Sequence, residues 1–241
     1  MHETADVSRP PLACLPPSTY GKEFWRTENR KFSEPWYRLE KTARLISQLT
    51  RGRNCTLLDV GCGPATLMRM LPRNIAYHGI DIAIHDPAPY LLEADLREAR
   101  IAFGDMRFDI VVAQGLFEYL GGVQAKKFAE IAQLLRPSGV FIVTYTNFGH
   151  RRPRVPELFS NVQSFDEFRL SLGHYFEIER IIPESHNWKH AQPNRRWLKT
   201  LNLHVNRRVP VISRKLAVEY YFVCSRPKPG WGPGETLDSG V

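Results

Sequence analysis

A short stretch of apolar, acidic and small residues, Leu57–Ala65, has the composition of a ligand-binding turn. Apolar residues lead into Asp59, and Gly61 and Gly63 follow at a spacing of two. This order predicts a buried strand, a tight turn and a helix over residues 66–71. The glycines let the backbone turn sharply and lie close to a ligand, and the N–H groups at a helix start attract polar groups. We therefore expect a nucleotide-like ligand at this turn.

An acidic residue closes the next predicted strand, Ile75–Ile82. Asp81 lies 20 residues after Gly61, and an acid at the end of the second strand can accept both hydroxyls of a ribose. The dinucleotide fingerprint requires a third glycine where Thr66 stands, so the spacing favours a different nucleoside. Two alternatives stay open: a glycine turn of another α/β protein, and a strand-end acid that only caps a turn.

The pattern D-x-G-x-G-x-A, from Asp59 to Ala65, resembles the first motif of class I S-adenosylmethionine (SAM)-dependent methyltransferases. The resemblance extends over residues 57–146 and includes an L-R-P-x-G segment, Leu135–Gly139, before an apolar strand. It implies an α/β, Rossmann-like fold with a seven-stranded, mostly parallel sheet, helices on both faces and an antiparallel last strand. It also implies SAM as the cofactor and S-adenosylhomocysteine as the product.

The same resemblance places the cofactor at the ends of the first four strands. Asp95, after the third strand, matches the position that receives the adenine amino group. Tyr20 begins an aromatic and basic arm that in such enzymes often folds over the cofactor, and packing on the sheet edge is the alternative. The predicted cofactor-binding residues are Tyr20, Asp59, Gly61, Cys62, Gly63, Asp81, Ile82, Asp95, Leu96, Gln114 and Gly115.

Methyl transfer is a direct displacement that depends on positioning, and a hydroxyl acceptor also needs a base. His150 follows the fifth strand and is the first candidate base, while Glu118 and Tyr119 border the expected methyl-transfer point. Some quinone-pathway members of the family bind magnesium at positions that correspond to Gly115, Glu118 and Tyr119. Because two of those three ligands are missing here, we expect no metal.

The length and composition fit one α/β domain: 241 residues, of which 43% are hydrophobic. We predict an N-terminal arm over residues 1–35, a single methyltransferase domain over 36–225 and a disordered tail over 226–241. Within the domain we expect a turn over residues 136–139 and an amphipathic helix over 36–50, with Leu39, Ala43 and Ile46 on its apolar side. The four cysteines form no C-x-x-C pair, which favours reduced thiols and a cytoplasmic location.

The net charge of +8 is concentrated in a predicted insertion over residues 186–215, which contains no acid. Its cations are Lys189, Arg195, Arg196, Lys199, Arg207, Arg208, Arg214 and Lys215. Such a segment fits an anionic partner such as phosphate, lipid or nucleic acid, and a solvated face or a packed lid is the alternative.

These observations favour O-methylation of a small-molecule or glycolipid-like acceptor. An amphiphilic or acidic acceptor and peripheral contact of the protein with a membrane are part of this expectation. The alternatives are an RNA methyltransferase that uses the insertion, although nucleic acid is the less favoured partner, and a SAM-binding protein without turnover. The sequence leaves the oligomeric state open.

Overall fold

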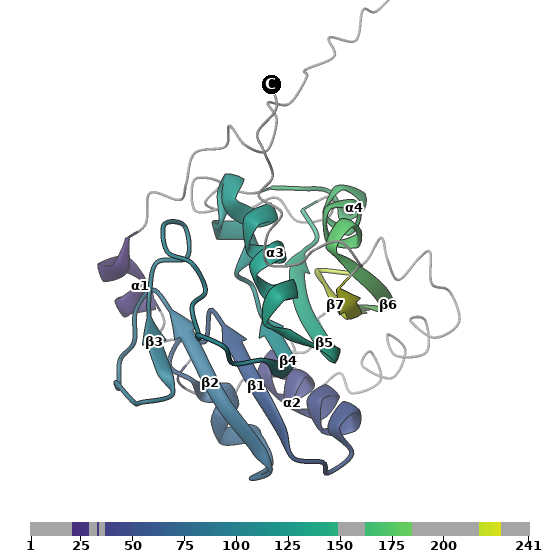
Figure 1. Cartoon of the computed structure of the whole chain (residues 1–241). Coiled ribbons are helices and arrows are strands. Elements are labelled where there is room, and N and C mark those ends of the chain that lie inside the picture. The colour runs from purple at the N-terminus through teal and green to yellow at the C-terminus, as the bar shows by residue number, and fades with distance from the viewer. Residues whose placement is uncertain (1–20, 29–32, 34–36, 149–161, 185–216, 228–241) are drawn as a thin grey trace, which may run out of the picture.

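Alternating strands and helices make up the computed structural model, which describes residues 21–28, 33, 37–148, 162–184 and 217–227 (Figure 1). The predicted Tyr20, His150 and basic insertion lie outside these residues. In chain order the elements are α1 (Lys22–Glu28), α2 (Tyr37–Thr50), β1 (Cys55–Val60), the 3₁₀ turn η3 (Thr66–Met70), β2 (Ile75–Asp81), β3 (Leu91–Glu93), β4 (Phe108–Ala113), the 3₁₀ turns η4 (Phe117–Tyr119) and η5 (Gly121–Val123), α3 (Gln124–Leu134), β5 (Leu135–Thr146), α4 (Phe165–Tyr175), β6 (Phe176–Glu184) and β7 (Glu219–Pro227).

The strands of the described residues form one seven-stranded sheet in the order β3-β2-β1-β4-β5-β7-β6. The first five pair in parallel, and β7 lies antiparallel between β5 and β6. This confirms the predicted Rossmann-like sheet. The chain order reverses between β1 and β4, and in open α/β sheets ligands bind outside the carboxyl ends of the strands at such a switch point.

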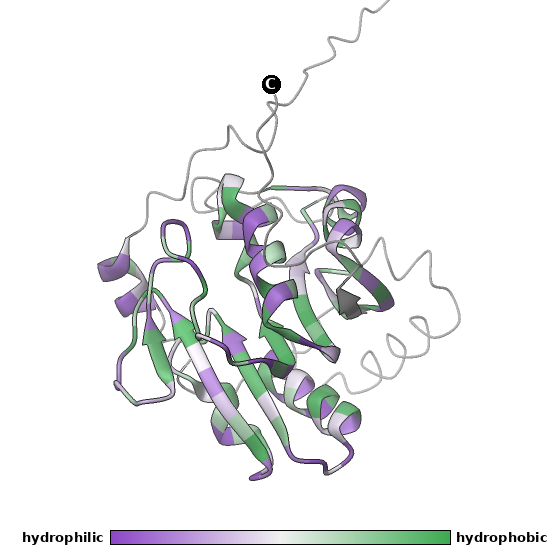
Figure 2. Cartoon of the chain, viewed as in Figure 1, coloured by the Kyte–Doolittle hydropathy of each residue, from purple (hydrophilic) through white to green (hydrophobic). Residues whose placement is uncertain are grey.

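Helices cover both faces of the sheet. Successive residues of a strand point to opposite faces, so each strand contributes side chains to two separate cores. Leu58 and its neighbours of the same face pack with α3 and α4, whereas Leu57 belongs to the core under α2 and η3. Figure 2 shows hydrophobic residues along the central strands and mixed hydrophilic and hydrophobic residues along α2 and α3. The two-sided burial accounts for the nearly continuous apolar runs of β1 and β4.

The predicted turn over residues 136–139 is part of β5 instead. Leu135 pairs with Phe108, and the register then shifts so that Val140 pairs with Ile110. The extra residues of β5 at this irregularity interrupt its hydrogen bonds to β4 locally, while β5 continues as one strand. Among the described residues, no helix combines the length and the apolar character that a membrane crossing needs.

Candidate functional site

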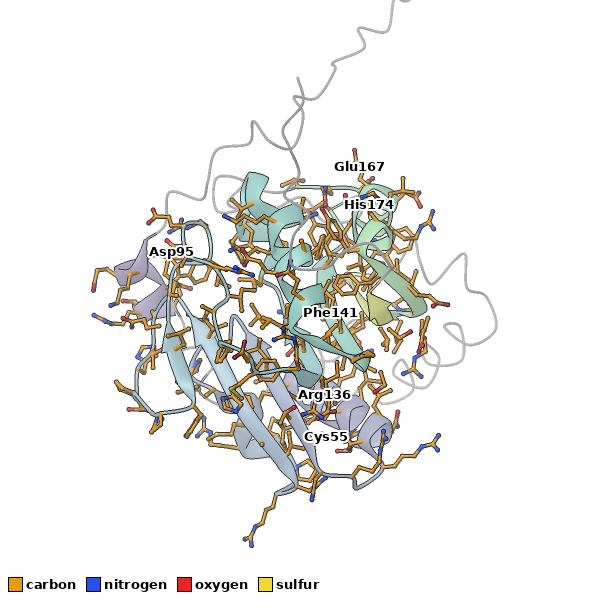
Figure 3. All side chains as sticks on the ribbon, viewed as in Figure 1. Cys55, Asp95, Arg136, Phe141, Glu167 and His174 are labelled. Carbon is orange, nitrogen blue, oxygen red and sulfur yellow. The ribbon has the colours of Figure 1, made fainter. Side chains whose placement is uncertain are left out.

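A cavity of about 320 Å³ lies at the carboxyl ends of β1 to β4. In Figure 3, Asp95 lies at this end of the sheet and Cys55 and Arg136 at the opposite end. The cavity is lined by ten of the eleven predicted cofactor-binding residues: Asp59, Gly61, Cys62, Gly63, Asp81, Ile82, Asp95, Leu96, Gln114 and Gly115. Its size falls in the range of small-molecule sites.

The turn after β1 is shaped by backbone that favours glycine. Gly61 has φ 78°, and a Cβ there would lie 3.2 Å from the Leu116 side chain. The N–H groups of Gly61 and Cys62 both donate to the Ile80 carbonyl, at 2.8 and 3.2 Å. The turn is therefore hydrogen-bonded to β2, and the helix predicted over residues 66–71 is a short 3₁₀ helix, Thr66–Met70.

Asp81 connects this turn to the end of β2. Its carboxylate accepts hydrogen bonds from the N–H groups of Gly63 (2.8 Å) and Ala83 (3.0 Å). The side chain is buried and lines the cavity. Asp81 thus stabilises the glycine turn, and its place at the strand end is the one expected for a ribose ligand; that role stays a prediction.

Asp59 is a buried carboxyl group, 4% exposed, that also lines the cavity. Burial raises its pKa from 3.8 to about 7, while the hydrogen bond from the Tyr77 hydroxyl (2.8 Å) opposes the rise and the charge of Asp81 adds to it. A cation bound beside Asp59 would favour the ionised carboxylate and lower this raised pKa.

Asp95 forms an ion pair at the β3 end of the cavity. Its carboxylate accepts from the Arg97 Nε at 2.9 Å and from the Arg97 backbone N–H at 3.0 Å. Burial opposes ionisation, but these hydrogen bonds outweigh it and lower the pKa of Asp95. Arg97 also lines the cavity, so any adenine at this end meets the pair rather than Asp95 alone.

Glu118 and Tyr119, the predicted catalytic residues in the described part of the chain, line the cavity beyond β4. Glu118 is 1% exposed, and its Oε1 accepts from the Thr146 N–H and hydroxyl, both at 2.9 Å. Its Oε2 is buried and has no hydrogen-bond partner among the described residues, and burial raises its pKa. Glu118 therefore ties the segment after β4 to the end of β5. Burial and the nearby Glu118 raise the pKa of Tyr119.

The lining residues that were not predicted include Trp25 of α1, Arg38 of α2 and Arg97. The Trp25 ring meets the Tyr119 ring edge-on, with centroids 4.8 Å apart. Arg38 forms an ion pair with Glu219 at the start of β7. The aromatic character of the arm was a signal for Trp25, whereas no local pattern separates Arg38 from the solvent-facing cations of an amphipathic helix.

The lining fits the charge distribution of SAM. Four carboxyl groups and two guanidinium groups line the described cavity: Asp59, Asp81, Asp95 and Glu118, with Arg38 and Arg97. The ligand has a sulfonium and an α-ammonium group, which suit the acids, and an α-carboxylate, which suits a cation. Among the described residues, no group of His, Cys, Asp and Glu side chains is arranged to hold a metal ion.

A family model described as a methyltransferase domain matches residues 58–143. This segment contains the glycine turn, Asp81, Asp95 and Glu118. The match agrees with the predicted resemblance to class I SAM-dependent methyltransferases, which is confirmed at the level of this family model.

Solved structures share the fold at low sequence identity. A SAM-dependent methyltransferase from Mesorhizobium loti is 14% identical, with a TM-score of 0.55 and coverage of 78% of this chain and 98% of that one. The [4+2]-cyclase SpnF is 18% identical, with a TM-score of 0.53 and coverage of 78% and 80%. A Haemonchus contortus phosphoethanolamine N-methyltransferase 2 in complex with SAM is 14% identical, with a TM-score of 0.52 and coverage of 77% and 52%. No curated protein sequence matches the chain.

Proposed function

We propose that this protein binds SAM and transfers its methyl group to a small-molecule acceptor. The observation that carries the proposal is the cavity where the strand order reverses between β1 and β4, within the segment that matches the methyltransferase model. All ten described residues of the predicted cofactor set line this cavity. When bound, SAM supplies an electrophilic methyl group on a sulfonium. The chain would hold the methionine end at the glycine turn and the adenine end beside Asp95 and Leu96.

We further propose a hydroxyl as the acceptor group, so that the reaction is an O-methylation. Such a reaction needs a proton acceptor near the end of β4 or β5. Glu118 and Tyr119 lie in this region, and His150 comes soon after β5 in the sequence. If His150 is the base, His150→Ala slows turnover and leaves SAM affinity unchanged; full activity of that variant would remove this assignment.

The first experiment is calorimetric binding of SAM and S-adenosylhomocysteine to the purified protein, with NAD as the control. The proposal expects both sulfur nucleosides to bind and NAD to fail; absence of binding by both would refute it. Transfer of labelled methyl groups to a panel of phenols, aliphatic alcohols and amines then tests the acceptor. Methylation of the amines but of neither class of hydroxyl would contradict the O-methylation proposal.

Turnover needs its own assay because the fold alone does not decide it: one similar structure is a cyclase. Binding of SAM without methyl transfer to any acceptor, RNA included, would favour the alternative of a binding protein. Contact of residues 186–215 with a membrane or RNA and a cytoplasmic location are further predictions. Neutralising Arg195, Arg196 and Lys199 should weaken such contact and its salt dependence.

A further inference from the structure

The central strands β2, β1, β4 and β5 begin at one level, at the end of the sheet opposite the cavity. Cys55 pairs with Ile75 at the starts of β1 and β2, Phe108 pairs with Leu135 at the starts of β4 and β5, and the third residues of β1 and β4 also pair. Neighbouring strands lie about 4.8 Å apart, so the four starts span about 14 Å. Figure 3 shows Cys55 at this end of the sheet and Asp95 at the other. Residues next to these starts therefore form one narrow surface.

Each of the four strand starts has an exposed arginine beside it. In strand order they are Arg73, Arg53, Arg107 and Arg136, and with the exposed Arg51 we call them the arginine row. Their segments are hydrogen-bonded to one another. Asn74 donates to the Arg53 carbonyl. The Thr56 hydroxyl and the Arg136 Nε both donate to the Arg107 carbonyl at 3.3 Å. The row is therefore one continuous surface.

Few acids balance the charge of the arginine row. The Arg136 Nε lies 3.6 Å from the Asp109 Oδ1, whereas the other four arginines form no ion pair with the described residues. Asp109 also accepts a hydrogen bond from the Thr56 N–H at 2.8 Å. The loops that contain the row, residues 51–54, 71–74, 104–107 and 136–139, include one further acid, Asp105. Five arginines and two acids leave a formal charge of +3 on this surface.

The residues beside the arginines indicate which anionic partner fits the row. Met106, next to Arg107, is 38% exposed, and the exposed Pro72 and Pro137 lie next to two other arginines. The four loops contain no aromatic residue, whereas proteins that bind single-stranded nucleic acid use aromatic rings to stack the bases. Clusters of about four to eight basic residues are typical of surfaces that bind anionic lipids. The combination of cations with exposed apolar side chains therefore favours a lipid surface.

We propose that the arginine row docks the protein on an anionic membrane surface, with the guanidinium groups on lipid phosphates and Met106 at the interface. A guanidinium binds a phosphate through two parallel N–H donors, which an ammonium group cannot do. The central strands run away from this surface, so the cavity at their carboxyl ends faces the aqueous side.

This inference goes beyond the proposed function, and it concerns a different end of the protein from the predicted basic insertion. Residues 186–215 lie in the sequence between Glu184 and Glu219, which pair with each other, and Glu219 also pairs with Thr146 at the carboxyl end of β5. The insertion therefore leaves and rejoins the sheet at the cavity end. Variants of the two regions can be compared directly.

Co-sedimentation with lipid vesicles tests the proposal without any cofactor. The wild type should bind vesicles of phosphatidylcholine with about one-third phosphatidylglycerol, and higher salt should weaken this binding. It should not bind vesicles of phosphatidylcholine alone. Each arginine near an anionic bilayer strengthens binding about fivefold. Arg73→Gln/Arg107→Gln should therefore bind the anionic vesicles about 25-fold more weakly than the wild type.

Arg169→Gln/Arg180→Gln is the matched control. It removes the same charge from exposed positions within α4 and β6, outside the arginine row, and it should bind the vesicles like the wild type. Arg51→Gly is a second variant of the row. Because Arg51 has φ 50°, a conformation that glycine adopts readily, this variant loses the charge without a cost in folding. It should bind about fivefold more weakly, and the melting temperature of each variant checks its fold.

Each outcome decides the matter. The inference is overturned if the wild type does not bind anionic vesicles, or if Arg73→Gln/Arg107→Gln binds them no more weakly than the control variant. Binding that is lost on neutralising Arg195, Arg196 and Lys199 but kept by the variants of the row overturns it as well and assigns the contact to residues 186–215. Binding of poly(U) RNA through the row without binding of vesicles also overturns it, and assigns the row to nucleic acid.

Discussion

Replacement of Asp59 by asparagine should change how the stability of the protein depends on pH. The carboxyl group is 4% exposed, and its pKa of about 7 means that the folded state retains a proton which the unfolded state loses near pH 3.8. Asparagine has the same shape, cannot ionise, and can still accept the hydrogen bond from Tyr77. The variant therefore removes the titration with little change in packing.

The sign and size follow from linkage. Below pH 3.8 both states of the wild type are protonated, and the full contribution of the neutral Asp59 is present. Between pH 3.8 and about 7 the unfolded state ionises alone, so the free energy of unfolding falls by about 1.4 kcal/mol per pH unit. Above pH 7 both states are ionised, and the accumulated loss is about 4 kcal/mol.

Urea denaturation of the ligand-free protein at intervals between about pH 5 and pH 8 measures this effect. The stability of Asp59→Asn relative to the wild type should rise by about 2.5 kcal/mol across that range. Asp86→Asn, which changes an exposed carboxylate, should run parallel to the wild type. Parallel curves for Asp59→Asn and the wild type would show that burial does not raise this pKa, and the reasoning would fail.

Three further predictions concern the cavity and its support. Asp81→Ala should weaken SAM binding by about 1.5–3 kcal/mol in calorimetry, and unchanged affinity would remove its assignment to the ribose. Trp25→Ala should reduce affinity about tenfold without lowering the melting temperature of the ligand-free protein, since α1 has no buried residue; equal affinities would place Trp25 outside the bound complex. Lys127→Met should lower the free energy of unfolding by about 3–5 kcal/mol, because it leaves the buried Glu130 carboxylate without its cation. The double variant with Glu130→Gln should recover part of that loss in urea denaturation, and no recovery would contradict the ion-pair explanation.

Much of the fold and ten residues of the cavity wall could be predicted because both follow local rules. Burial on both faces of the sheet produces the apolar runs of β1 and β4, and acids such as Asp81 and Asp95 lie at or just after strand ends. Parallel strands bring their carboxyl ends to one edge of a sheet, so residues next to strand ends in the sequence come together in space. For that reason the ten described residues of the predicted cofactor set all line one cavity.

Other features depended on how separate elements pack. The position of β7 between β5 and β6 places Glu219 beside Thr146. Thr146 then donates a hydrogen bond to Glu118, and Glu219 forms the ion pair with Arg38. The periodicity of the sequence does not predict these contacts, because Glu118 and Glu219 each have the pattern of an ordinary turn or strand-end residue.

The sequence by itself determined the strand–turn–helix pattern, the parallel sheet and ten of the residues that line the cavity, since apolar runs and glycine turns depend on a few neighbouring residues. Only the tertiary structure decided that Arg38 enters the cavity and that the pKa of Asp59 rises to about 7. The physical reason is that a cation on an amphipathic helix and an acid at a strand end acquire their roles from neighbours distant in the chain. Desolvation and ion pairing depend on those neighbours, and packing alone places them.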